Sequence, residues 1–205
     1  MDLREKIINL SRELFLSSGF SGITVEDISA ELGISKKTFY KIFPDKKNLL
    51  KAAIFSQISI TEEKIAKIFA AENKPVIQKF KALSETLIAN TSKITPVFIR
   101  DIKKNAPEIW EEMSKKRKVL IIKYFTRVID EGVENRVIRS DLDKKLFILI
   151  YLAAIENVIN PTVLSEMEYS AGEVFDVIIT MIFEGVLTEK GRKNLKKLRV
   201  ASNSK

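Results

Sequence analysis

The 205-residue sequence contains no cysteine and no histidine. These absences exclude a cysteine nucleophile, an imidazole base and any zinc or iron site with Cys or His ligands. The seven glycines are scattered, so the sequence has no glycine-rich phosphate-binding loop. Enzymes that use only Asp, Glu, Lys, Ser or Tyr remain possible, but no pair of these residues stands at a telling spacing. We therefore expect no enzyme, no catalytic residue, no metal site and no cofactor.

Long hydrophobic runs are also lacking. The longest, Leu146 to Ile155, has ten residues, whereas a helix needs ~20 to cross a bilayer. The first residues, Met1 to Lys6, lack the apolar segment of a signal peptide. The absence of cysteine fits a reducing compartment. The sequence thus predicts a cytoplasmic protein without a membrane partner.

Basic residues are in excess, and their distribution matters more than their number. The formal net charge is +8, yet residues 1–50 hold eight Lys/Arg and seven Asp/Glu. Within this stretch, Ser35 to Lys47 carries five lysines against one aspartate. Such a cluster attracts phosphates without reading a sequence. A second basic stretch, Lys190 to Arg199, is interpreted as a solvated, frayed final helix.

Hydrophobic periodicity predicts an all-α fold, because no alternating strand pattern of useful length occurs. The predicted helices span residues 3–18, 25–32, 36–42, 46–71, 75–90, 96–104, 107–132, 141–159 and 171–187. We expect a DNA-binding domain at residues 1–46. A larger helical domain at 47–205 would follow it through a shared long helix.

The N-terminal signals fit a helix-turn-helix. Gly19 is placed to end the first helix, and Thr24 with Asp27 forms a predicted capping box for the second. Gly33 ends that helix, and Ser35 is a good N-cap for the third. Two short helices joined by a tight turn can place the second one in a DNA major groove.

Polar residues near the start of the third helix would then reach the DNA. Lysine donates to guanine O6 and N7, and threonine hydrogen-bonds a base or touches a thymine methyl. Apolar residues of the segment would instead lock the helices together. They are Ile28, Leu32, Ile34, Phe39 and Phe43.

A spaced set of residues over about 7–54 resembles the N-terminal pattern of the TetR family of transcriptional regulators. The matching positions are Leu14-Phe15, Gly19-Phe20, Thr24, Ile28, Gly33-Ile34-Ser35, Thr38-Phe39-Tyr40, Phe43, Lys46 and Leu49. Beyond residue 54 the resemblance is general only. Ser29 and Leu32 stand where the family favours alanine, and Lys37 where a small residue or proline is common.

The resemblance implies roles for matching positions. Thr24, Tyr40 and Lys46 would contact the DNA backbone, Thr24 through its hydroxyl and its helix N-terminus. Other residues would lie along the face presented to the groove. They are Ser35, Lys36, Lys37, Thr38 and Lys41.

The resemblance also implies a C-terminal domain that dimerises through its last two long helices and often encloses a small-molecule pocket. Two segments support dimerisation independently. Leu146 to Ile155 is apolar all round, as is much of Val174 to Phe183, so each must be covered on every side. Either a partner subunit supplies part of that cover, or both helices are central in one monomer.

Candidate pocket residues are large side chains on core-facing stripes, although plain core packing explains such residues as well. They are Phe80, Phe98, Trp110, Met113, Tyr124 and Tyr151. Arg117 falls between Met113 and Tyr124 on one helical face, and Glu156 and Asn157 end an apolar run. If such a charge is buried, it needs a partner, either a ligand or a salt bridge. A position at the protein surface would remove that need.

Together these features predict a repressor that binds a palindromic double-stranded DNA operator as a homodimer and is released by a small-molecule effector. A constitutive dimeric DNA-binding protein without an effector pocket is the alternative. The sequence identifies neither the effector nor the operator.

Overall fold

The computed structural model describes residues 1–71 and 73–202, and in them eleven α-helices and no β-strand. The all-α prediction is thus confirmed. None of the helices in this part of the chain is long and apolar enough to cross a membrane. The helices are α1 (Leu3–Ser18), α2 (Val25–Glu31), α3 (Lys36–Ile42), α4 (Lys46–Ala70), α5 (Val76–Thr91), α6 (Pro96–Asn105), α7 (Pro107–Glu134), α8 (Lys144–Val158), α9 (Pro161–Ser165), α10 (Ala171–Glu184) and α11 (Glu189–Ser202).

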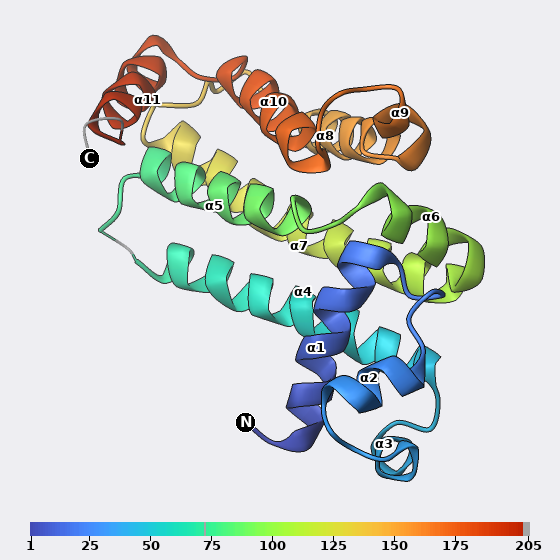
Figure 1. Ribbon diagram of the computed structural model, residues 1–205. Coiled ribbons are helices and arrows are strands. Elements are labelled where there is room, and N and C mark those ends of the chain that lie inside the picture. Colours follow the sequence, from blue (N-terminus) through green and yellow to red (C-terminus); the bar gives the residue numbers. More distant parts are fainter. Residues whose placement is uncertain (72, 203–205) are drawn as a thin grey trace.

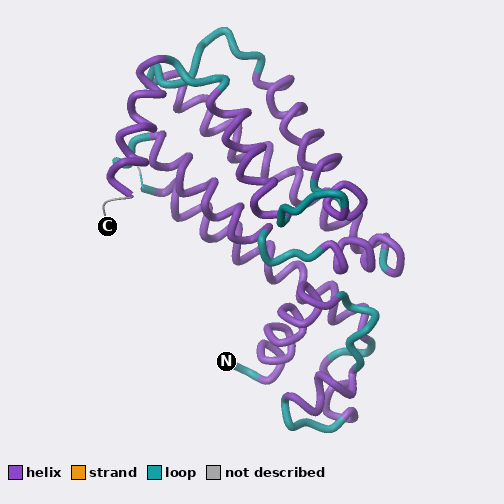
Figure 2. Tube along the Cα trace, turned by 45° about the horizontal axis from the view of Figure 1, so that its top comes forward, coloured by secondary structure: helices purple, strands orange, loops and turns teal. Residues whose placement is uncertain are grey.

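The first three helices form a unit at one end of the molecule (Figures 1 and 2). The long helix α4 begins beside this unit and runs along α5 and α7 into the rest of the chain. Helices α8 and α10 pack on each other, and α10 also covers α5. Helix α11 lies at the end of the molecule remote from α2 and α3.

Two hydrophobic cores meet along α4. The first gathers α1 to α3 and the N-terminal half of α4, and it also takes in Phe98 and Ile102 of α6 and Met113 of α7. The second joins the C-terminal half of α4 to α5, α7, α8, α10 and α11. Apolar packing therefore crosses residue 46, where the sequence predicts a domain boundary, and that boundary remains a prediction.

Most helix ends lie within three residues of their predicted positions. Helix α8 begins at Lys144 rather than near 141, because the Asp143 side chain accepts from the amides of Lys145 and Leu146. The short helix α9 was not predicted, and α11 is a regular helix through Ser202. An isolated antiparallel bridge between Ile138 and Leu187, also unpredicted, ties the chain after α7 to the chain after α10.

The backbone at Gly191 in α11 lies against this bridge. A Cβ atom added to Gly191 would sit 2.2 Å from the carbonyl oxygen of Val137, and backbone cannot move aside as a side chain can. We expect Gly191→Ala to lower the free energy of unfolding by ~1–3 kcal/mol. Chemical denaturation measures the change.

Gly185→Ala is the matched control. Gly185 ends α10 with ordinary helical dihedral angles, and a Cβ there meets its nearest atoms at 3.5 Å. This substitution should change stability by less than ~1 kcal/mol. Equal losses for the two variants would contradict the proposed clash at Gly191.

Candidate nucleic-acid interface and ligand cavity

The turn between α2 and α3 is built by the predicted caps. The Thr24 hydroxyl accepts from the Asp27 amide at 3.0 Å, and the Asp27 carboxylate accepts from the Thr24 amide at 2.8 Å, which confirms the capping box. The Ser35 hydroxyl accepts from the Thr38 amide at 3.1 Å. Gly33 has φ +64°, in the left-handed region that glycine adopts at little cost. These contacts fix α3 relative to α2.

One side of α3 is buried and the other is exposed. Phe39 is completely buried, and Phe43 nearly so, against α1 and α4. Lys37 and Lys41 are exposed, and no hydrogen bond or salt bridge engages their ammonium groups within the described residues. Helix α3 thus presents a free basic surface.

The other predicted DNA contacts differ in their surroundings. Lys36 forms an ion pair with Glu26 of α2. Tyr40 is half exposed and packs edge-on against Phe39. Ser35 is exposed, whereas Thr38 is half-buried and its hydroxyl lies 2.9 Å from the Ser35 hydroxyl. All of these lie on or beside the outer side of α3.

Lys46 is held by the protein itself. Its ammonium donates to the carbonyl oxygens of Ser21 and Ile23, at 3.2 and 2.8 Å. It also lies over the Phe20 ring. Partial burial lowers the pKa of Lys46, and the nearby carboxylates of Asp101 and Asp27 oppose that change. Lys46 therefore fastens the start of α4 to the loop before α2, and its DNA contact stays a prediction.

A polar contact joins the same loop to α6. The Asp101 carboxylate accepts from the amide and hydroxyl of Ser21 and from the Asn105 side chain at 2.7 Å. The Thr95 hydroxyl, which caps α6, donates to the Leu16 carbonyl at 2.9 Å. Helix α6 is thus hydrogen-bonded both to the end of α1 and to the loop before α2.

These contacts make stability depend on pH. Partial burial raises the pKa of Asp101, but hydrogen bonds from Ser21, Asn105 and Phe20 outweigh it, so the pKa lies below its ordinary value. Because the folded pKa is below the unfolded one, the stabilisation is complete above about pH 5 and is lost as pH falls through the folded pKa. We expect wild type to exceed Asp101→Asn in unfolding free energy by ~1–2 kcal/mol at pH 7.

Urea denaturation from pH 7 to pH 3 measures this difference, which should shrink below about pH 4. Glu111→Gln, on the exposed side of α7, serves as the control and should show little difference at either pH. A difference between wild type and Asp101→Asn that stays constant down to pH 3 would contradict the role given to Asp101.

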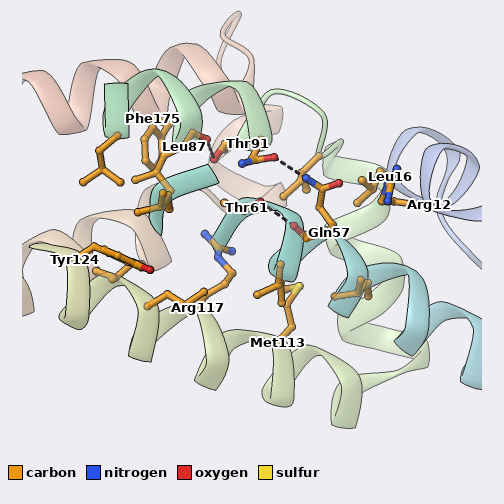
Figure 3. A pocket seen from close by; sticks show the side chains of 18 of the residues that line it. Arg12, Leu16, Gln57, Thr61, Leu87, Thr91, Met113, Arg117, Tyr124 and Phe175 are labelled. Carbon is orange, nitrogen blue, oxygen red and sulfur yellow. Dashed lines mark hydrogen bonds between the residues drawn. The ribbon is translucent and has the colours of Figure 1, made fainter. Parts of the chain in front are cut away.

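Two adjoining cavities lie between the helices, and Figure 3 shows the first of them, the inner cavity. The inner cavity, of about 120 Å³, is lined by residues of α1, α4, α5, α6, α7, α8 and α10. The outer cavity, of about 320 Å³, lies chiefly between α6, α7 and α8. Both are lined by Thr91, Ile94, Phe98, Met113, Arg117 and Ile121. A ligand could therefore extend from one cavity into the other.

Seven of the nine candidate pocket residues predicted from the sequence line these cavities. The inner cavity has Tyr124 and Tyr151, the outer one Trp110 and Glu156, and both have Phe98, Met113 and Arg117. Phe80 lies elsewhere, its ring 4.0 Å from that of Phe183 in the second core. Asn157 instead donates to the Ala153 carbonyl on α8.

Arg117 projects from α7 into the space beside α4 (Figure 3). Arg117 is half-buried, and among the described residues no hydrogen bond or ion pair engages its guanidinium. Burial lowers the pKa of Arg117, which the nearby Tyr151 and Glu156 oppose. Burial likewise raises the pKa of Tyr151, with Arg117 opposing. Both side chains line the inner cavity.

The polar residues that α1, α4 and α5 supply to the inner cavity were not predicted from the sequence. Gln57 donates to Asn90 at 2.7 Å across the inner cavity (Figure 3). Thr61 also lines it, and Arg12 of α1 reaches it with a buried Nη1 that has no hydrogen bond. Only Arg12, between apolar positions of α1, carried any signal in the sequence.

The apolar helices α8 and α10 are not covered on every side within one chain. Leu146, Leu149 and Ile150 of α8 are 52, 59 and 52% exposed. Val177 and Met181 of α10 are 56 and 71% exposed. The alternative that both helices lie wholly inside one monomer's core is therefore wrong, and an exposed apolar face remains.

Residues 7–53 match the model of the bacterial regulatory proteins of the tetR family. This match contains α2, α3 and the turn between them. Residues 7–53 thus belong to the tetR family of bacterial regulatory proteins. Beyond this segment the chain is also similar to helix-turn-helix regulators. It is 23% identical to the HTH-type transcriptional regulator YvaF of Bacillus subtilis, over 91% of this chain and 96% of that protein.

One further relative and two solved structures are also similar to most of the chain. The HTH-type transcriptional repressor DhaR of Mycobacterium sp. is 25% identical over 90% of this chain and 92% of its own. A TetR-family regulator from Marinobacter aquaeolei has a TM-score of 0.73 at 18% identity, with 98% of both chains covered. A regulator from Saccharomonospora viridis, solved in complex with choline, has a TM-score of 0.70 at 18% identity over 91% of this chain and 98% of that chain. The C-terminal helices therefore have the TetR-family fold.

Proposed function

We propose that this TetR-family regulator is a repressor that binds a palindromic operator as a homodimer and releases it on binding a small-molecule effector. The observation that carries the proposal is the position of Phe98 and Met113. Both line the two cavities and both belong to the core that holds α1 to α3. A ligand that moves either side chain acts directly on the packing of the DNA-binding unit.

Helix α6 is the proposed connection. Phe98 faces the cavities, and one turn further on Asp101 holds Ser21 beside the start of α2. A rotation or shift of α6 would therefore move α2 and α3 with it. In a dimer such a shift changes the distance between two recognition helices, which must fit half-sites ~34–36 Å apart or a multiple of that.

The DNA contacts are proposed as the sequence predicts them. Lys37 and Lys41 would enter the groove as free cations, with Lys36, Ser35 and Thr38 beside them. Further contacts to phosphates are assigned to Thr24, Tyr40 and Lys46. The division into residues 1–46 for DNA binding and 47–205 for the effector and dimerisation is likewise proposed. Helix α6 touches the first domain together with α4 and α7.

The dimer is proposed to form through the exposed apolar face of α8 and α10. Monomeric proteins seldom expose contiguous apolar surface of this kind, and twofold dimers are the commonest assemblies. The DhaR relative is named a repressor, and the Saccharomonospora regulator was solved with a small molecule. Both support the proposal.

Selection from a pool of random duplexes tests the function. The full-length chain should enrich an inverted repeat whose half-sites are one helical turn, or a multiple of it, apart. A single unrepeated site, or no enrichment at moderate salt, would overturn the proposal. An enriched repeat whose complex responds to no effector would favour a constitutive DNA-binding dimer.

A further inference from the structure

The charge of the cavity lining is unusual for a chain with 27 acidic residues. Arg12 and Arg117 line the inner cavity, and no carboxylate does. The outer cavity adds Lys103 and Lys118 against a single acid, Glu156. Most of the other residues of the inner lining are apolar. Both cavities therefore favour an anion over a cation.

Besides Arg12, whose Nη1 has no hydrogen bond, two donors beside this space have no acceptor. In the described part of the chain no hydrogen bond or ion pair engages the half-buried Arg117, and Glu156 of the outer cavity is not within ion-pair distance of it. Tyr151 is 99% buried, since its exposed fraction is 1%, and no hydrogen bond engages its hydroxyl among the described residues. A buried charge or hydroxyl without a partner costs free energy that a suitable ligand would recover.

We propose that the effector is an amphipathic monoanion whose acid group is bound by Arg117 and Tyr151 and whose apolar body lies in the inner cavity. A carboxylate accepts two N–H bonds from a guanidinium and still has a lone pair for a phenol hydroxyl. The apolar side chains of Ile54, Ile58 and Leu83 line the space beyond. This proposal rests on the proposed effector response and names the class of effector.

The opposite assignment, a cationic effector, has weaker support. A cation at the same place would face Arg117 with no acid from the inner cavity to balance it. Glu156 is exposed and lies on the outer cavity alone, where Lys103 and Lys118 compete with it. A neutral amphiphile would fill the apolar space and leave both donors unpartnered, which lowers its affinity relative to the acid.

Matched ligands test the class. We would titrate the full-length chain with octanoate, 1-octanol and octylamine, and with 4-phenylbutyrate and 4-phenylbutanol for a body with a ring. Calorimetry gives the affinities. The fluorescence of Trp110, the single tryptophan of the sequence, reports on the outer cavity. We expect at least one acid to bind at least 10-fold more tightly than its alcohol, and octylamine to bind most weakly.

Three variants locate the acid group. Arg117→Met should lower acid affinity at least 30-fold and alcohol affinity less than 3-fold, and Tyr151→Phe, which removes only a hydroxyl, should lower acid affinity ~5-fold. Lys115→Met, at an exposed position of α7 that lines neither cavity, should change both affinities less than 3-fold. Binding of acid and alcohol with equal affinity, an unchanged acid preference in Arg117→Met, or the absence of acid binding at 10 mM would each overturn the proposal.

Binding to the operator distinguishes this proposal from the proposed effector response on which it rests. Arg117→Met should bind the selected operator as wild type does without ligand, because Arg117 lies on α7, outside the helices proposed to contact DNA. Acid that binds but leaves the operator complex intact would overturn the effector response while the ligand class stands. Operator release by the alcohol or the amine, with no release by the acid, would overturn the ligand class alone.

Discussion

Chains in which Leu149 and Met181 are both replaced by aspartate should be monomers that bind the operator at least 100-fold more weakly than wild type. The two side chains are 59 and 71% exposed on neighbouring helices of one apolar face. In a twofold dimer this face meets its own copy, so each substitution places two carboxylates in the interface. Buried charges without partners cost several kcal/mol.

The loss of DNA affinity follows from the loss of the partner. In a dimer the second recognition helix binds at an effective concentration set by the first, commonly in the millimolar range. A monomer has only the affinity of a single half-site. Light scattering measures the mass, and fluorescence anisotropy with the selected duplex measures the affinity.

Val119→Asp is the control, because Val119 is 64% exposed on α7 and just as apolar. It should remain dimeric and bind DNA as wild type does. Circular dichroism should show all three proteins equally helical. A dimeric Leu149→Asp/Met181→Asp protein would contradict the proposed interface. A monomer with full operator affinity would contradict the need for two DNA-binding units.

Replacing both Lys37 and Lys41 by alanine should weaken operator binding at least 100-fold in 0.1 M salt without lowering stability. Both ammonium groups are exposed and free in the described structure, so the fold loses nothing. A dimer loses four cations, each worth ~1 kcal/mol or more against bases or phosphates. The dependence of log affinity on log salt should also become shallower by about one for each lysine that contacts a phosphate.

Lys64→Ala/Lys67→Ala is the matched control, since it removes the same charge from exposed positions in the far half of α4. Its operator affinity should stay within about 3-fold of wild type, because only the net charge has changed. Lys36→Ala should cost less than Lys37→Ala, because Lys36 already pairs with Glu26. Equal losses in the α3 and α4 double variants would mean that the lysines of α3 contribute charge but no contact.

The helix-turn-helix could be predicted from the sequence because its capping and turn residues act locally. A capping residue acts on an amide three positions away, as Thr24 and Ser35 do, and Gly33 fixes its own dihedral angles. The positions of these residues therefore predicted α1 to α3 to within one residue. The end of α10 at Glu184 was less predictable, because Leu187 takes part in a long-range bridge with Ile138.

The residues that line the cavities could be predicted only in part. Large side chains on the inner face of α7 pointed to it, but the same pattern placed Phe80 there, which packs in the second core instead. Gln57, Asn90 and Arg12 come from three helices that sequence periodicity cannot bring together. The sequence likewise gave no sign that Lys79, 4% exposed, is paired with Glu131 at 2.7 Å.

The central claim is that the two DNA-binding units of a dimer bind one operator together and release it with the effector. Native mass spectrometry of the full-length chain with the selected duplex tests this claim most directly. We predict two chains, or a multiple of two, on each duplex and none on a scrambled duplex of the same composition. Addition of the binding acid should return free dimer and free DNA. One chain per duplex, equal retention of scrambled DNA, or a complex that persists with acid bound would contradict this.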